Sequence, residues 1–169
     1  TGRIAIRMAR DSTPLWQKKI TYAVGAETLI TGETDYNTAT GTRDRKLYYV
    51  AGVNGQLGFD QTDSLLDPTK GFRLTALVQP EATVKGGFNP YIRSRIDGSG
   101  YFPVTDSLVL AGRVRLGTIK GAGLFDIAPS RRLYAGGGGS VRGYSYQALG
   151  EQAADGKAVG GRSLNEASV

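Results

Sequence analysis

The chain has 169 residues, 25 of them glycine, with a formal net charge of +6 and neither cysteine nor histidine. The two missing residue types exclude disulfides, thiolate metal sites, and the commonest side-chain metal ligand and general base. Mean hydropathy is −0.25, and no apolar run reaches the ~18 residues that a transmembrane helix needs. The length predicts one domain. A start at Thr1-Gly2 without Met or an apolar signal core indicates a piece of a longer protein.

In chain order, apolar and polar residues alternate in segments of about ten, separated by turn residues, which is typical of a transmembrane β-barrel. Side chains of a strand point to opposite faces with period two, so each segment has one apolar and one polar face. In segment 91–98, for example, Ile92 and Ile96 oppose Arg93 and Arg95. The alternating segments are 3–10, 17–31, 45–59, 72–81, 91–98 and 107–118.

The positive charge does not favour nucleic-acid binding, because the arginines are scattered singly along these segments rather than clustered. We interpret most charges as one solvated face, which in a barrel is the lumen. The residues predicted to face it are Arg73, Arg93, Arg95, Arg113, Arg115 and Glu166.

The strands of a soluble antiparallel sandwich also alternate apolar and polar residues, but two features favour a membrane barrel. Several segments exceed the usual strand length of about 5–6 residues, whereas a membrane strand needs ~9–11. Aromatic residues also gather near segment ends, as expected of interfacial girdles. They are Trp16, Phe59, Phe72, Phe88, Tyr91, Tyr101 and Phe102.

The predicted connections fall into two sets. Turns 11–14, 63–71 and 103–106 are expected at one end of the sheet, and the polar connection 34–44, the Gly-containing turn 85–87 and a long excursion over about 121–160 at the other. A stretch of almost forty residues without regular structure is uncommon in a compact domain and is usually functional. Six side chains make it apolar enough to pack: Leu133, Tyr134, Val141, Tyr144, Tyr146 and Leu149.

The long excursion contains the strongest motif of the chain, Arg131 to Gly150. Glycine takes positive φ and lets other groups approach the backbone, so Arg142 is expected at the tip of a tight loop, where its five-donor fork suits a fixed docking site. The docking motif is Val141, Arg142, Gly143 and Tyr144, and the supporting loop residues are Gly136, Gly137, Gly138, Gly139, Ser140 and Tyr146. Arg131 and Arg132 are interpreted as a solvated pair that could assist.

No motif indicates an enzyme. The glycine run lacks the Lys and Ser/Thr of a phosphate-binding loop, and no dinucleotide-binding pattern is in register. The carboxylates form no recognisable catalytic pair, and there is no nucleophile elbow. We therefore predict no catalytic residue, no metal and no cofactor.

The motif segment resembles the loop signature of the Omp85 superfamily of outer-membrane barrels. Its continuation Ser145-Tyr146-Gln147-Ala148-Leu149-Gly150 is most similar to the TamA-type branch of autotransporter assembly factors. The turn Asp67-Pro68-Thr69-Lys70-Gly71 also resembles a turn that recurs in these barrels.

The resemblance implies an all-β fold, a partial transmembrane antiparallel barrel of sixteen strands in the complete protein. Residues 1–169 would form part of one barrel domain, with 3–10 as the sixth strand, 107–119 as the eleventh, and the twelfth beginning at 161–166. The motif would lie on an extracellular loop over about 121–160 that folds back into the barrel, where Arg142 docks on the inner wall. Its family partners, an aromatic and an acidic residue, lie on a strand beyond this chain; the nearest acid present is Glu166.

The implied function is the insertion or secretion of autotransporter-type barrel proteins in the outer membrane of a Gram-negative bacterium. The implied partners are outer-membrane lipid, client barrels, upstream POTRA repeats and a TamB-like inner-membrane protein. Three alternatives remain open: a two-partner-secretion transporter or general barrel-assembly protein of the same superfamily, an enzyme fused to the barrel, and a passive pore or soluble β-sandwich binding module.

Overall fold

A computed structural model describes residues 2–10, 19–84 and 87–169 and contains one antiparallel sheet of seven strands in the order β1 to β7. This architecture confirms the predicted all-β fold of a partial barrel. Within the described ranges, no helix is long and apolar enough to cross a membrane. The elements are β1 (Gly2–Arg10), β2 (Lys19–Asn37), β3 (Thr42–Asp60), β4 (Gly71–Val84), β5 (Phe88–Thr105), β6 (Leu108–Lys120), the 3-10 turns η2 (Leu124–Asp126) and η3 (Pro129–Arg131), and β7 (Ser163–Ser168).

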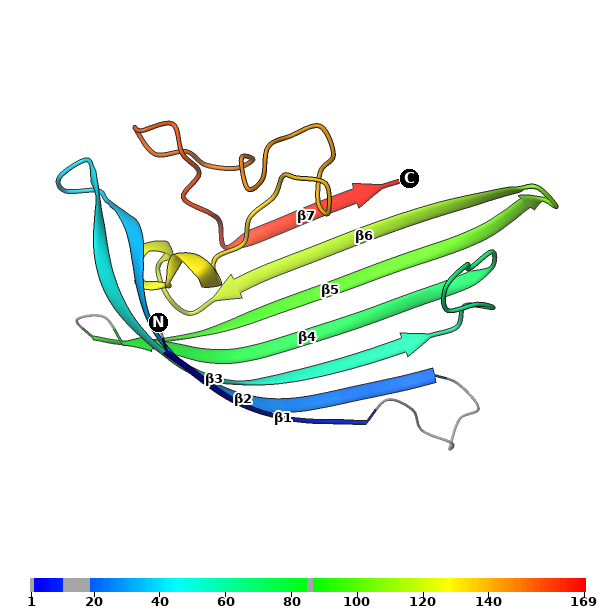
Figure 1. Ribbon diagram of the computed structural model, residues 1–169, viewed down its shortest axis with the longest axis horizontal. Helices are drawn as coiled ribbons and strands as arrows, with labels where there is room; N and C mark the ends of the chain where they lie inside the picture. The colour runs from blue at the N-terminus through cyan, green and yellow to red at the C-terminus, as the bar shows by residue number, and fades with distance from the viewer. Residues whose placement is uncertain (1, 11–18, 85–86) are drawn as a thin grey trace.

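The sheet is curved, and the β6–β7 connection lies over its concave face (Figure 1). Every strand pairs with its sequence neighbour, and β1 and β7 form the two edges. An open edge leaves backbone N–H and C=O groups unpaired, which lipid does not tolerate, so a closed barrel needs further strands beyond both edges.

The two faces of the sheet differ as the alternation predicts. Apolar side chains on the convex face are exposed, including Ile6, Val53 and Leu74 at 70%, 53% and 42% of their surface. The charged and polar side chains of the same strands face the connection. The described residues form a single sheet with this apolar face exposed, which is the arrangement of a partial barrel and not of a two-sheet sandwich.

The buried core lies between the concave face and the start of the β6–β7 connection. One cluster joins Tyr91 and Ile119 of the sheet to Ala122 and Ile127, with Leu133 packed against it. A second joins Tyr48 and Val50 to Ala128, with Leu29 beside them. The apolar surface buried in this molecule therefore fixes the connection to the sheet.

The connections differ from the prediction at one place. The turns near 63–71 and 103–106 appear as residues 61–70 and 106–107, and turn 11–14, Trp16 and residues 85–86 lie outside the described residues. The predicted polar connection 34–44 is wrong: β2 continues to Asn37, β3 begins at Thr42, and only four residues turn. Residues 31–37 and 42–48 pair with each other and lie beyond the registers of β1 and β4. We call these two stretches and their turn the β2–β3 ribbon.

The aromatic girdle stays a prediction, and the rings assigned to it differ in exposure. The rings of Phe59 and Phe72 lie 5.8 Å apart between centroids, and Phe88 and Phe102 are 72% and 67% exposed. Tyr91 is an exception: it lies on the concave face, 2% exposed, and belongs to the core. Its hydroxyl finds a carboxylate there, as a buried tyrosine requires.

Candidate functional site: the seat of the motif loop

The connection between β6 and β7 begins with a base of two short turns, which we call the loop base (residues 121–132). Pro129 starts the second turn, where its fixed φ is compatible with helical geometry and its missing N–H costs nothing. Ile127 and Ala128, just before it, are fully buried. These anchors direct the next three residues, Ser130, Arg131 and Arg132, onto the sheet.

Arg132 occupies a completely buried ion pair with Asp35 of β2. Its Nη1 and Nη2 donate to Asp35 Oδ1 and Oδ2 over 2.8 and 2.6 Å, and the two side chains are 1% and 2% exposed. Tyr48 donates a further hydrogen bond to Asp35 Oδ2 over 2.7 Å. The Phe125 ring centroid lies 5.2 Å from the guanidinium carbon, within cation–π range.

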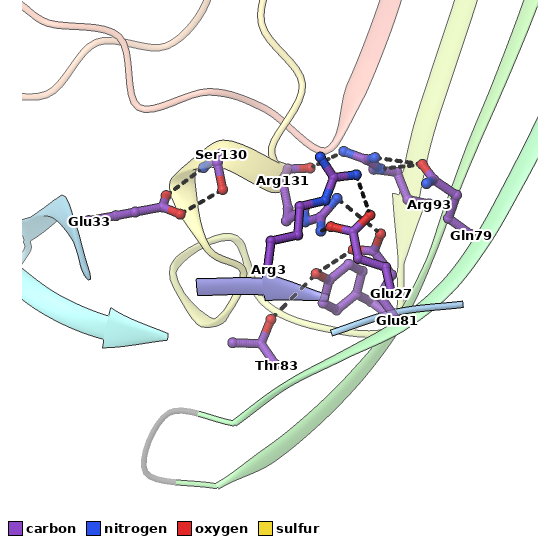
Figure 2. Close-up of polar contacts among 10 residues, drawn as sticks. Arg3, Glu27, Glu33, Gln79, Glu81, Thr83, Arg93, Ser130 and Arg131 are labelled. Carbon is purple, nitrogen blue, oxygen red and sulfur yellow. Dashed lines mark hydrogen bonds and ion pairs between the residues drawn. The ribbon is translucent and has the colours of Figure 1, made fainter. Parts of the chain in front are cut away.

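Arg131 lies in a second charged cluster (Figure 2). Its guanidinium contacts Glu27 of β2 and lies 3.6 Å from Glu81 of β4. Tyr91 donates to Glu81 over 2.8 Å. Burial alone would lower the pKa of Arg131, but Glu81 and Glu27 outweigh it and hold the pKa above its usual value. The side chain therefore stays charged in its seat.

Neighbouring side chains complete the same polar surface. Arg93 donates to Gln79 Oε1 over 3.0 Å and to the Arg131 carbonyl over 3.3 Å. Ser130 donates through its N–H and its hydroxyl to Glu33 over 2.8 and 2.7 Å. The three consecutive residues Ser130, Arg131 and Arg132 thus cover carboxylates of two strands, and the contacts of the two arginines are complementary in charge.

The prediction that Arg131 and Arg132 form a solvated pair is wrong. Arg131 is held by carboxylates of β2 and β4 and Arg132 by Asp35 of β2, with Arg132 4% exposed as a residue. The sequence holds one signal for this contact surface: Glu27, Glu33 and Asp35 are separated by six and two residues, both multiples of two, and therefore lie on one face of β2. Like charges on one face need cationic partners when they are buried.

The motif segment itself lies farther from the sheet. A backbone bridge pairs Ala135 with Leu149, and Gly136 takes a φ of 109°, where an added Cβ would lie 2.6 Å from the Ser145 carbonyl oxygen. By contrast, Gly138 and Gly139 have nothing within 4 Å of an added Cβ. Only part of the four-glycine run is therefore required by the described geometry.

Arg142 is exposed, and no hydrogen bond or ion pair joins it to any residue that the structure describes. Gly143 after it has a φ of 91°, as expected of a tight tip. Tyr144 and Tyr146 are 57% and 80% exposed, so these two predicted packing residues do not pack here, whereas Leu133 does. Val141 is half-buried. Docking of Arg142 stays a prediction.

The sheet residues singled out as lumen-facing all lie on the polar face, and all except Arg93, whose partners are Gln79 and the Arg131 carbonyl, form ion pairs with one another or with acids. Arg73 donates to Asp60 over 2.9 Å, and Asp97 lies 2.8, 3.9 and 2.6 Å from Arg95, Arg113 and Arg115. Glu166 lies 3.3 Å from Arg115 and accepts from the Ser140 hydroxyl. The nearest acid thus contacts the motif loop at Ser140 rather than at Arg142.

The outer part of the loop touches the β2–β3 ribbon. Arg43 pairs with Asp155 and donates to the Lys157 carbonyl over 3.3 Å. The hydrogen bond from Arg43 holds the pKa of Asp155 below its usual value. Both side chains keep solvent contact, so this pair contributes little to stability.

The arrangement binds and positions a loop. Within the described residues no group of three or more acidic side chains could hold a metal ion. Carboxylates and tyrosine hydroxyls pair with the buried arginines, and among the described residues Arg131 Nε is the one buried side-chain nitrogen or oxygen without a hydrogen-bond partner. The result is a loop fixed on a curved, polar surface.

A curved antiparallel sheet with an apolar outer face and a loop fixed on its polar inner face defines a piece of an outer-membrane β-barrel with an internal loop. The sequence matches the Omp85 superfamily domain over residues 4–169, and the chain therefore belongs to the Omp85 superfamily. Membership places it in the outer membrane of a Gram-negative bacterium.

One relative carries a functional name. The outer membrane protein assembly factor BamA of Nitratidesulfovibrio vulgaris (strain Hildenborough) is 33% identical over 86 residues. The matched stretch covers 51% of this chain and 11% of that protein.

Proposed function

We propose that this chain forms part of a sixteen-stranded barrel that inserts or secretes other outer-membrane proteins. The observation that carries the proposal is the long β6–β7 connection, whose base is buried against the inner face by Arg131 and Arg132. A passive diffusion pore has no need of a loop fastened across its lumen. The role requires no catalytic group or cofactor from this segment.

Two client classes are supported by different observations. The continuation Tyr144-Ser145-Tyr146-Gln147 favours autotransporter-type clients, and with them POTRA repeats upstream and a TamB-like inner-membrane partner. The BamA relative favours general barrel assembly. We propose the autotransporter role and keep general assembly as the second candidate.

Depletion of the complete protein in its own bacterium tests these roles. The measurement is quantitative mass spectrometry of outer membranes and culture medium before and after depletion. Loss confined to autotransporters supports the first role, and loss of most barrel proteins supports general assembly. Loss of one secreted protein with normal barrels indicates two-partner secretion. Unchanged proteomes overturn the assembly proposal.

We further propose that Arg142 docks on the inner wall of the complete barrel, against strands that follow β7. The exposed tip and the absence of a partner among the described residues support a partner farther along the barrel. Complementation with Arg142→Ala is expected to reduce assembly activity and the protease resistance of the loop, while Arg162→Ala, an exposed arginine at the loop's end, leaves both unchanged. Wild-type behaviour of Arg142→Ala would refute the docking role.

A further inference from the structure

The motif segment leaves and rejoins the loop base at a single narrow point. Leu133 and Gly161 exchange two backbone hydrogen bonds of 2.9 and 2.8 Å, which brings the two limbs together just before β7. Residues 133–161 therefore form a closed lasso, and its neck consists of Arg132, Leu133, Val159, Gly160 and Gly161. Whatever holds the neck determines where the lasso, and Arg142 on it, is placed.

Arg132 connects three separate parts of the chain at this neck. Its Nε donates to the Ile127 carbonyl over 3.1 Å, on the limb that enters the lasso. Its Nη1 donates to the Val159 carbonyl over 3.0 Å, on the limb that leaves it. Its two terminal nitrogens also hold Asp35 of β2. One guanidinium thus closes the neck and ties it to the barrel wall.

The backbone at the neck is shaped around this side chain. Gly160 has a φ of 79°, and a Cβ added there would lie 2.9 Å from Arg132 Cβ and 2.7 Å from Tyr134 Cζ. Only glycine permits such an approach without strain. The backbone at Gly160 therefore packs tightly against Arg132. The burial of Arg132 comes from residues of this chain.

The remaining attachments of the lasso are weaker. Beyond the neck, the polar side-chain contacts from the lasso to the sheet or ribbon, among the described residues, are Arg43 with Asp155 and Lys157, and Ser140 with Glu166. The Arg43 pair is solvent-exposed, and exposed pairs contribute ~0–1 kcal/mol. The completely desolvated pair at Arg132 is far more sensitive to loss of one partner.

We propose that Arg132 is the positioning residue of the motif loop: through Asp35 it fastens the neck of the lasso to β2, and so sets the place of Arg142 independently of any contact that Arg142 makes. Its guanidinium donates hydrogen bonds to the Asp35 carboxylate and to the Ile127 and Val159 carbonyls at the same time. A lysine has a single nitrogen and cannot reproduce this fork.

The test uses the complete protein in lipid nanodiscs, with proteinase K cleavage inside 133–161 followed by mass spectrometry. Arg132→Gln is expected to accelerate cleavage there about ten-fold or more, because local opening no longer breaks the buried pair. Arg132→Lys should rescue only part of the protection. Arg162→Gln is the matched control, since this exposed arginine makes one hydrogen bond, to the Ala122 carbonyl over 3.1 Å.

A double-mutant cycle with Asp35→Asn separates positioning from a general loss of stability. If the two side chains act as one unit, the double variant is cleaved no faster than Arg132→Gln alone. Additive effects, or wild-type protection in Arg132→Gln with a heat-modifiable, folded barrel, overturn the proposal. Should Arg132→Gln fail to fold, the Arg132→Lys variant provides the test. Wild-type protection in Arg132→Lys refutes the proposal that the branched guanidinium is needed, and intermediate protection supports it. The readout involves no client, so it does not depend on the proposed function.

Discussion

Three neighbouring residues make similar contacts but differ in how deeply they are buried. Ser130, Arg131 and Arg132 each meet a carboxylate, but the Ser130 contact to Glu33 lies at an exposed residue, and Arg131 keeps 12% of its side chain exposed. The Arg132–Asp35 pair is removed from solvent on both sides. A buried charge that loses its partner is left uncompensated, whereas an exposed one is solvated by water. The rank order of the three contacts follows from this difference.

At the residue scale we therefore predict a large contrast between two acids of one face of β2. Asp35→Asn should lower the stability of the complete protein by about 3–5 kcal/mol, because Arg132 loses a buried counter-charge. Glu33→Gln, two residues away, should cost less than about 1 kcal/mol. Urea titration followed by tryptophan fluorescence or heat-modifiability measures both. Equal losses of stability in the two variants would mean that burial does not determine how much each carboxylate contributes to the stability of the protein.

The sequence could not identify this seat from local pattern. The β2 partners of Arg131 and Arg132 lie 104 and 97 residues away in the chain, and Glu81 of β4 is also far from Arg131 in sequence. Adjacent arginines before a glycine run look solvated unless the register of β2 and β4 is known. The tip geometry at Gly143 was predictable, since it depends only on neighbouring residues.

At the scale of elements, alternation predicted the two faces of β4, β5 and β6 because period-two placement is a property of the strand alone. It failed at residues 34–44, whose polar composition suggested a loop. There the β2–β3 pairing satisfies the backbone hydrogen bonds, and polar side chains on both faces are compatible with a ribbon that lies beyond the neighbouring strands. Composition alone does not distinguish a solvated ribbon from a loop.

The turn between β3 and β4 is organised by one carboxylate. Asp63 accepts hydrogen bonds from the Thr69 hydroxyl over 2.5 Å and from the N–H groups of Ser64, Thr69 and Lys70 over 3.0 to 3.1 Å. The Thr69 hydroxyl, followed by the Lys70 amide, lowers the pKa of Asp63 from 3.8 to about 2. The stabilisation is present above the unfolded pKa of 3.8 and is lost as the pH falls through about 2.

We accordingly expect the Asp63 carboxyl to titrate near pH 2, as measured by carbon NMR on the complete protein in nanodiscs. Asp63→Asn should increase amide exchange of Thr69 and Lys70 several-fold at pH 7, because the carboxylate is replaced by a weaker acceptor. Asp67→Asn is the control, as the Asp67 carboxylate accepts none of these amide bonds. A midpoint near 3.8 would contradict the assignment.

At the scale of the whole molecule, the sheet separates two environments. Large apolar side chains cover the convex face, and the concave face holds charges, the loop base and the core clusters. This division predicts the orientation of each strand side chain toward lipid or lumen. The open edges at β1 and β7 are consistent with a chain that spans only part of a larger barrel.

Arginine substitutions on the two faces of β3 should have opposite consequences. Val53→Arg on the convex face, where Val53 is 53% exposed, should destabilise the inserted barrel by about 2–4 kcal/mol if it lies near the bilayer midplane. Gln56→Arg on the concave face should be tolerated. Membrane fractionation and heat-modifiability of the complete protein measure both, and equal insertion of the two variants would exclude a lipid-facing convex surface.

The β2–β3 ribbon carries Asp35 and Tyr48 and ends in a turn of four residues at 38–41. Two-stranded ribbons twist and bend more readily than the body of a sheet. The ribbon thus joins a four-residue turn to the carboxylate that holds the neck of the lasso. Because Asp35 lies on the ribbon and not on the part of the sheet that β1 and β4 also pair with, the placement of the lasso depends on the conformation of this ribbon.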